Sequence, residues 1–380
     1  SVASRGLGDV YKRQEVDMKI LKNITVFTMV MLLSVSTVLE AREKNISNFS
    51  SSASNLVDST GTFDGNKIYA DVANNGLFLD FHVSGDSALE WPKGTGVHSI
   101  FQSALWMGAT VNGSIRTIVG DYTQDMGPGP WGGDPLAAVH RIYKVEKSML
   151  ASPLDFADFQ EWPVEFGAPW VDVDGDGVYT PLPGGTDHPE FLGDQVLWFV
   201  SNDGDPAYKL NFGTSPMNVE IQTTMFGFDR PDVFGDMVFL KQLVINKGSD
   251  DLVDTYMGLW SDPDLGYAGD DFVGCDVALG MGYVWNDGDD SQYSTLDIGT
   301  PAAGYDFFQG PMVPCEDGDS EEVCPTEGAK MFGTRHPGMK NLKMSSFAFY
   351  INGDATYTDP SDETEGYFYL QGLRKDGSAY

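Results

Sequence analysis

From Phe63 onward the chain consists of short apolar or alternating runs, and each run stops at Gly, Asn, Asp or Pro. The clearest pair of runs flanks Asn112-Gly113, a dipeptide that supplies the two positive-φ positions of a type I′ turn. We therefore predict a hairpin between the run that ends at Val111 and the run that begins at Ser114. Strands this short, separated by turns, favour antiparallel sheets. An α/β fold would need alternating helices, which the pattern lacks.

The same pattern recurs in DQVLWFVSND, NVEIQTTMFGFD and SFAFYING, each of which predicts a strand. Val238–Asn246 and Val253–Trp260 are predicted to pair with each other across the polar loop 247–251. With 44 Gly and 20 Pro distributed among such runs, we expect an all-β protein. It would be an antiparallel β-sandwich, or two packed β-sandwich-like domains with long acidic loops, as subdomains of about 61–185 and 186–380.

One short helix is expected near 153–161, in SPLDFADFQEWP. Ser152 is the predicted N-cap, Pro153 suits the first turn, and Pro163 ends the helix.

The first sixty residues divide into three segments. Ser1–Gln14 resembles a translated sequencing-adaptor tail, so we treat 1–17 as an artefact and Met18 as the natural start. Residues 18–41 have a basic beginning, an apolar run from Ile24 to Val35 and small residues before Ala41, which is typical of a secretory signal peptide. The alternative, a transmembrane anchor, needs roughly 20 apolar residues. The polar segment 42–60 is expected to be a flexible linker.

The charge balance restricts the partners. The chain has 23 Lys+Arg against 56 Asp+Glu, a net charge of −33. A field this negative repels phosphate backbones and anionic lipid, so we expect no nucleic-acid partner and no membrane insertion after signal removal. It attracts cations.

The three cysteines of the chain are consistent with export to an oxidising compartment, where disulfides persist. Cys315 and Cys324 bracket a short acidic loop and are predicted to form a disulfide, while Cys275 is left over. Three reduced cysteines are the alternative.

The strongest site motif is VDVDGDGVYTP, residues 171–181. Asp172, Asp174 and Asp176 occupy positions 1, 3 and 5 of a D-x-D-x-D-G calcium loop, with a glycine at position 6 and the carbonyl of Val178 at position 7. Position 12 is a proline instead of an acid, which excludes the complete helix-loop-helix form. The closing ligand is expected from Asp187, Glu190 or Asp194. A solvated acidic turn is the alternative.

A second, less regular cluster follows a strand-like run and is another candidate calcium site; its residues are Asp262, Asp264, Asp270, Asp271 and Asp276. A third candidate is Asn286, Asp287, Asp289 and Asp290. For both clusters the alternative is a rigid loop in which aspartates accept backbone N–H bonds.

Catalytic motifs are scarce. Glu161 and Glu165 lie among aromatic residues, as in a glycosidase, but Pro163 separates them. No nucleophile elbow, P-loop, dinucleotide fingerprint or zinc-protease motif occurs. A glycan-binding platform would draw on the tryptophans, namely Trp106, Trp131, Trp162, Trp170, Trp198 and Trp260, although most tryptophans of a β protein lie in its core.

Several segments together carry a family resemblance, the most specific being WSDPDLG and GYDFFQGP. With GLFLDF, LEWPKGTGVHSIFQSALWMGATVNGSIR and EWPVEFGAPWVDVDGDGVYTP, they resemble the N-terminal region of large uncharacterised secreted proteins that Bacteroidota-like bacteria export through the type IX pathway. The likeness runs from about Asn75 to Gly377. It implies a secreted or cell-surface protein with a C-terminal sorting domain. The chain reaches Tyr380 without one, so we expect a truncated gene fragment.

The resulting hypothesis is a secreted or cell-surface, non-catalytic structural or adhesive β module that calcium stabilises. Extracellular polysaccharide or a cell-surface matrix is the expected partner. The alternative is a carbohydrate-active enzyme or a glycan-binding domain.

Overall fold

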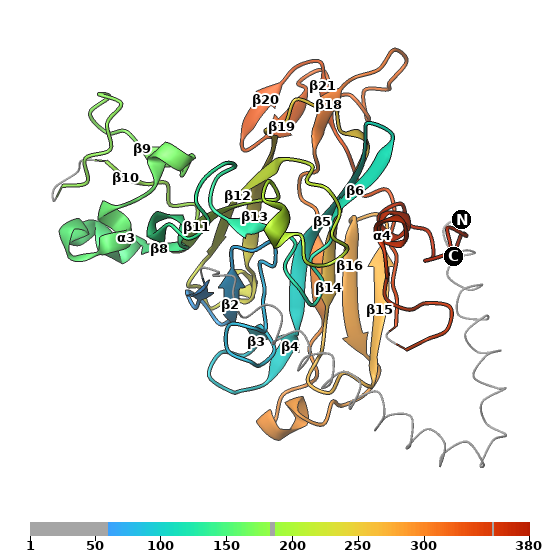
Figure 1. Cartoon of the computed structure of the whole chain (residues 1–380). Coiled ribbons are helices and arrows are strands. Elements are labelled where there is room, and N and C mark those ends of the chain that lie inside the picture. The colour runs from blue at the N-terminus through green and yellow to red at the C-terminus, as the bar shows by residue number, and fades with distance from the viewer. Residues whose placement is uncertain (1–59, 183–186, 352) are drawn as a thin grey trace. The chain divides into compact units, whose positions relative to one another are not determined.

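The computed structural model describes residues 60–182, 187–351 and 353–380. The predicted tail, signal peptide and all of the linker except Thr60 lie outside the described residues. The described residues form one compact unit. The all-β prediction is confirmed, because several packed antiparallel sheets make up this unit (Figure 1).

Two sheets form the central sandwich. The five-stranded sheet has the order β13-β12-β11-β7, with β8 also paired to β11. Its strands are β7 (Gly127–Pro128), β8 (Tyr143–Glu146), β11 (Gln195–Asn202), β12 (Val219–Gly227) and β13 (Phe239–Asn246). The three-stranded sheet has the order β14-β5-β6 and comprises β5 (Gln102–Val111), β6 (Ser114–Ile118) and β14 (Val253–Asp262).

Alternating side chains explain how these two sheets pack. Leu105 and Met107 of β5 lie in one buried cluster with Val219 and Ile221 of β12. The intervening residue Trp106 points to the opposite face of the sheet and packs in a different cluster. This period of two is what a strand buried on both faces requires.

A second layer of the core lies beside the sandwich. The sheet β1-β2-β3-β4 comprises β1 (Thr60–Phe63), β2 (Tyr69–Ala73), β3 (Leu89–Glu90) and β4 (His98–Ile100). Phe63 and Val72 of this sheet share a buried cluster with Leu197 and Phe199 of β11.

The remaining elements are shorter. The smaller sheets contain β15 (Asp271–Asp276), β16 (Met281–Asn286) and β17 (Ala303–Asp306); β18 (Met312–Pro314) with β21 (Met339–Asn341); β19 (Ala329–Met331) with β20 (Thr334–His336); and β9 (Trp170–Val171) with β10 (His188–Pro189). The α-helices of the described residues are α3 (Ala157–Gln160) and α4 (Glu363–Leu370), and short 3-10 turns lie between the strands. In Figure 1, α3, β9 and β10 project together from the side of the sandwich.

The predicted helix near 153–161 is only partly present. Pro153–Asp155 forms a 3-10 turn and α3 follows it, so the segment never becomes one continuous helix. Ser152 makes no side-chain cap bond. Phe159 and Trp162 of this segment are buried against the outer face of β8 and β11, and this tertiary packing decides the local shape.

The predicted hairpin is present, since Val111 pairs with Ser114 and the turn residues Asn112 and Gly113 have φ of 51° and 80°. The predicted pairing of Val238–Asn246 with Val253–Trp260 is wrong. β13 pairs with β12, and β14 pairs with β5. The polar loop between β13 and β14 carries the chain from one sheet of the sandwich to the other.

The strand predicted in SFAFYING is also wrong, because residues 346–351 have no strand structure. Their aromatic side chains pack individually. Tyr350 lies against Trp106, with ring centroids 6.4 Å apart, and Phe349 stacks on Tyr357 at 5.5 Å. Hydrophobic content alone therefore does not distinguish a strand from a packed loop here.

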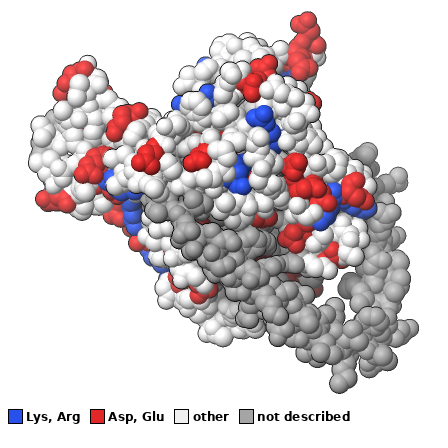
Figure 2. All heavy atoms as spheres, in the orientation of Figure 1, with Lys and Arg blue, Asp and Glu red and all other residues white. Residues whose placement is uncertain are grey.

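Strands from both sides of residue 185 pair within the same sheets, as β8 does with β11 and β5 does with β14. Within the described ranges, no helix has the length and apolar character needed to cross a bilayer. Acidic side chains are scattered over the face drawn in Figure 2, with fewer Lys and Arg among them.

Candidate metal centre

The D-x-D-x-D-G motif lies in the connection between β9 and β10. β9 ends at Val171 and β10 begins at His188, and the two strands pair in antiparallel fashion. Gly175 and Gly177 have φ of 79° and 75° in this loop, a conformation that glycine adopts at little cost. The sequence therefore turns sharply twice within six residues.

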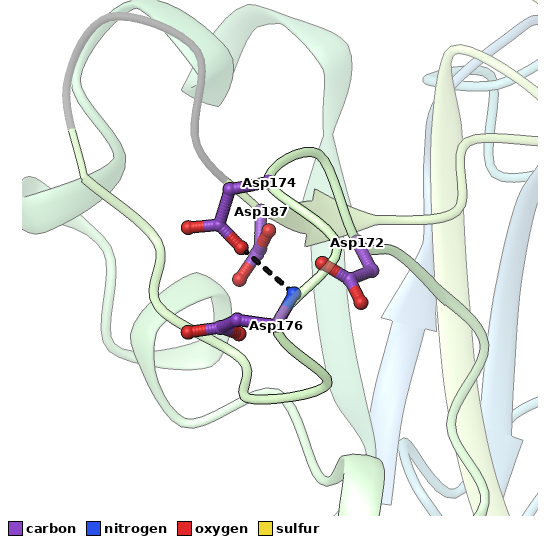
Figure 3. Close-up of side chains that lie close together, drawn as sticks. All are labelled: Asp172, Asp174, Asp176 and Asp187. Atoms are coloured by element: carbon purple, nitrogen blue, oxygen red, sulfur yellow. Dashed lines mark hydrogen bonds between the residues drawn. The ribbon is translucent and has the colours of Figure 1, made fainter.

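Four carboxylates meet in this loop. Asp172, Asp174, Asp176 and Asp187 each offer a ligand oxygen, and these oxygens all lie within 4.8 Å of one another. Figure 3 shows the four side chains around one small space. The first three are exposed, whereas Asp187 is 1% exposed.

The geometry selects Asp187 among the three candidate closing residues. Glu190 instead faces Lys241, with the charged atoms 3.8 Å apart, and Asp194 pairs with Lys147 at 3.2 Å. Among the residues that the structure describes, none of the four gathered carboxylates takes part in a salt bridge with Lys or Arg. The nearby His188 contributes positive charge that lowers the pKa of Asp187, but no Lys or Arg within the described ranges pairs with the cluster.

Backbone N–H groups hold the loop carboxylates in place. Asp172 accepts from Gly175 at 2.6 Å and from Gly177 at 3.0 Å. Asp174 accepts from the N–H of Asp176 at 3.2 Å, the bond drawn in Figure 3. Asp176 accepts from Val178 at 2.7 Å. These bonds preset the carboxylates, so binding an ion would cost little reorganisation.

Asp187 accepts hydrogen bonds from the backbone on both sides of the acidic turn. Its Oδ1 accepts from the N–H of Val173 at 2.9 Å, and its Oδ2 accepts from the N–H of Thr180 at 2.8 Å. Burial raises the pKa of Asp187, but the hydrogen bonds from Thr180 and Val173 lower it further, so the pKa lies below its usual value. Asp187 is therefore ionised at neutral pH.

The loop is also fixed to the core. The Tyr179 ring packs edge-on against Trp170, with centroids 5.6 Å apart, and its hydroxyl donates to the carbonyl of Phe159 at 2.6 Å. Burial, followed by the charge of Asp187, raises the pKa of Tyr179. The phenol therefore stays protonated and keeps this bond at physiological pH.

The second predicted cluster is not gathered in the same way. Across 60–182, 187–351 and 353–380, only the β9–β10 loop brings at least three candidate ligands this close together. Asp262 accepts from the Tyr122 hydroxyl at 3.0 Å, Asp264 is buried, Asp270 is exposed, and Asp271 accepts from the N–H of Leu265 at 2.9 Å. Burial, then the charges of Asp264 and Asp270, raise the pKa of Asp271 to about 6.

In the third cluster Asp290 organises a turn. Its carboxylate accepts from the N–H groups of Tyr267, Gln292 and Tyr293, at 2.9, 2.7 and 2.8 Å. This is the pattern of an aspartate that satisfies backbone donors.

Half of the eight tryptophans are core residues. Trp106, Trp162, Trp198 and Trp260 are each 8% exposed or less. Trp131 is 42% exposed and lines a half-open depression of about 300 Å³ with Asn202, Asp205 and Asn218. Glu161 is exposed and forms a 2.9 Å ion pair with Arg141.

Cys315 and Cys324 form the predicted disulfide, with Cα atoms 5.9 Å apart, and Cys275 is free.

The structure also contains a buried group of charged side chains that no sequence motif predicts. Its members are Asp125, Asp203 and Lys209. Each comes from a polar loop whose composition resembles that of exposed loops, so no local pattern marks these residues as buried.

Comparison of this chain with protein-family models, with curated proteins and with solved structures finds no match.

Proposed function

We propose that this chain is a secreted or cell-surface structural or adhesive β module whose β9–β10 loop binds a calcium ion. The observation that carries the proposal is the convergence of Asp172, Asp174, Asp176 and Asp187. Four carboxylates so close together repel one another unless a cation lies between them.

The donor set favours calcium over other metals. All four side chains supply hard oxygen ligands, and no cysteine or histidine belongs to the group. Calcium accepts six to eight oxygens in flexible geometry, and the three exposed carboxylates leave room for water and for the carbonyl of Val178. Zinc prefers nitrogen and sulfur ligands, and magnesium demands stricter octahedral geometry.

Ion binding would stabilise more than the loop itself. Asp187 bonds to the backbone on both sides of the acidic turn, and Tyr179 fixes the loop to the buried cluster around Trp162 and Trp198. A bound ion would therefore hold the β9–β10 segment against the five-stranded sheet.

Export rests on separate support. The leader-like segment 18–41, the acidic composition and the family resemblance all point to a protein outside the cytoplasm. A disulfide between Cys315 and Cys324 is of the kind that persists in oxidising compartments. Expression of the full chain in a bacterial host tests this part. We expect a mature N-terminus between residues 36 and 42, and intact Met18 on the recovered protein would contradict export.

Calcium titration tests the metal site. At a hundredfold excess over Kd, an ion that binds only the folded state adds about 2.7 kcal/mol to the free energy of unfolding. We expect calcium to raise the melting temperature relative to chelator, and equal magnesium to raise it less. An unchanged melting temperature, together with no heat of binding in calorimetry, would refute the site.

A double variant with a matched control locates the effect. Asp174→Asn with Asp176→Asn removes two ligands, and Asp251→Asn with Asp317→Asn removes the same charge from exposed positions outside the loop. We expect the first pair to abolish the calcium response and the second pair to retain it. A response that both pairs retain would place the ion elsewhere.

A second candidate function, glycan binding, rests on Trp131. Its ring lies directly over Gly204, where a Cβ would come within 2.6 Å of Trp131 Cδ1, and its Nε1 donates to Asn218 at 3.1 Å. An exposed, fixed indole beside Asn and Asp side chains is the kind of surface on which sugars stack. A glycan array tests it, with Trp131→Ala expected to lose any binding and Trp285→Ala, another exposed tryptophan, expected to keep it.

A further inference from the structure

A buried group of charged side chains lies apart from the residues of the acidic loop. The side chains of Lys209, Asp125 and Asp203 are 1%, 2% and 0% exposed. Lys209 Nζ lies 2.8 Å from Asp125 Oδ2 and 3.9 Å from Asp203 Oδ2. An amine and two carboxyl groups are thus enclosed together.

The surroundings of this group are apolar. Met126, Met217 and Val219, which adjoin these residues in sequence or by hydrogen bond, belong to the central buried cluster. Lys209 Nζ also donates to the carbonyl of Thr117, at 2.5 Å. Bulk water therefore does not screen the electrostatic interaction between the amine and the carboxyl groups.

The two carboxyl groups differ in their hydrogen bonds. Asp203 accepts from the N–H groups of Met217 and Val219, both at 2.7 Å, which favours its charged form. Asp125 accepts from the N–H of Val119 at 2.9 Å through Oδ2, whereas its buried Oδ1 has no well-formed hydrogen bond. Asp125 is therefore the carboxyl group better suited to carry a proton.

The charge balance agrees with this assignment. Burial raises the pKa of Asp125 to about 6, against the opposing effect of the Lys209 charge. Burial also raises the pKa of Asp203, against the same charge and the bonds from Val219 and Met217. One ammonium, one carboxylate and one carboxylic acid give a neutral enclosed group, which a low-dielectric site favours.

We propose that Lys209 and Asp125 condense to form an intramolecular amide bond, with Asp203 as the proton acceptor. The bond would covalently join the loop after β6 to the turn after β11, between residues 84 positions apart in the sequence. It is independent of the proposed calcium site, since no residue is shared.

The reaction balances without an oxidant or cofactor. Asp203 takes one proton from the Lys209 ammonium and leaves a neutral amine. The amine nitrogen attacks the carboxyl carbon of Asp125 and forms the new N–C bond. A second proton moves from this nitrogen to the departing hydroxyl, the C–O bond breaks, and one water molecule leaves. The amide keeps one N–H, and Asp203 ends as a neutral carboxylic acid.

The enclosed site favours each of these steps. Proximity converts the reaction of an amine with a carboxylic acid into a step within one molecule. A protonated carboxyl group is a better electrophile than a carboxylate. Burial also keeps other water molecules away from the new amide, which slows its hydrolysis. In bulk water the same two groups would remain an ion pair.

Mass spectrometry of the purified full chain tests the proposal. We compare the intact mass of the wild type with that of Lys209→Arg, after subtracting the mass difference between Lys and Arg. We expect the wild type to be lighter by the mass of one water molecule. Trypsin should fail to cleave after Lys209, and the digest should contain a branched peptide that joins Lys209 to the fragment from Thr117 to Arg141. The wild-type mass decides the matter even where the variant folds poorly.

Two results would overturn the inference. One is a wild-type chain at full mass that trypsin cleaves after Lys209 once the chain is unfolded, which would leave a non-covalent ion pair. The other is a loss of water without the branched peptide, which would indicate a cyclised Asp-Gly sequence elsewhere. We also expect Asp203→Asn to accumulate uncondensed chain, whereas the exposed control Asp317→Asn condenses fully.

Discussion

Asp121 is a buried carboxyl group whose ionisation opposes folding. It is 8% exposed in the loop after β6, and its Oδ1 accepts from the N–H of Tyr122 at 2.6 Å. Burial raises the pKa of Asp121 to about 7, although hydrogen bonds from Tyr122 and Asn211 lower it and the charge of Asp359 raises it. Replacing this group with asparagine removes the ionisation while retaining the shape.

The size of the effect follows from proton binding. Between the ordinary pKa of 3.8 and the folded value of about 7, the folded state holds a proton that the unfolded state has lost. The free energy of unfolding therefore falls as pH rises through this range, at about 1.36 kcal/mol per pH unit. The full range amounts to about 4 kcal/mol, of which roughly 3 kcal/mol lies between pH 5 and pH 8.

Urea unfolding at pH 5 and pH 8 measures this directly. We expect the wild type to lose about 3 kcal/mol more than Asp121→Asn between the two pH values. Comparing the differences cancels any pH-independent cost of the substitution. Asp317→Asn changes an exposed acid and should follow the wild type. Equal pH dependence of the wild type and Asp121→Asn would refute the assignment of a raised pKa to this group.

Three further predictions concern packing, a turn and the disulfide. Trp106→Ala should lower the free energy of unfolding in urea by about 3 to 5 kcal/mol, because the ring is buried and stacks on Trp260 with centroids 5.6 Å apart. A loss under about 1 kcal/mol would contradict this. Gly113→Ala, at φ 80°, should cost about 1 to 2 kcal/mol, and an unchanged urea midpoint would count against the turn. Cys315→Ser with Cys324→Ser should lose at most about 3 kcal/mol and speed proteolysis of that loop, and unchanged proteolysis would argue against a structural bond.

The parts of the fold that sequence predicts well are local. The hairpin at Asn112 and Gly113 needs only a turn of fixed geometry and two flanking runs, so its register follows from residues within about ten positions. β11 is likewise marked by the apolar run from Val196 to Val200, and β12 by β-branched and aromatic residues that alternate with polar ones. In these segments the local preference and the final structure agree.

Long-range pairing is the part that the sequence leaves open. β14 pairs with β5, so that Trp260 lies opposite Ala104, although β13 is its neighbour in the chain. Both partners offer strands of suitable length, and a polar loop permits a hairpin or a crossing between sheets. The choice depends on which apolar faces become buried together, which local sequence does not encode.

Helix α4 was missed for a related reason. Its sequence ETEGYFYL contains Gly and three aromatic residues, which are weak helix formers. The helix forms because Asp362 accepts from the N–H groups of Thr364 and Glu365, and because Tyr367 and Tyr369 are buried. Capping and tertiary packing thus outweigh propensity.

The two sites differ in how well the sequence predicts them, and the difference has a physical origin. The four-aspartate loop is a local motif, because Asp172, Asp174 and Asp176 alternate along one turn, and only Asp187 comes from the far end of the loop. The buried amine and carboxyl groups come from segments 84 residues apart, and no spacing rule connects them. A motif search therefore detects a site whose ligands the backbone brings together, and overlooks one that the packed core assembles. In an acidic chain the second kind is recognised by burial, since an exposed carboxylate needs no explanation but a buried group of two carboxyls and one amine does.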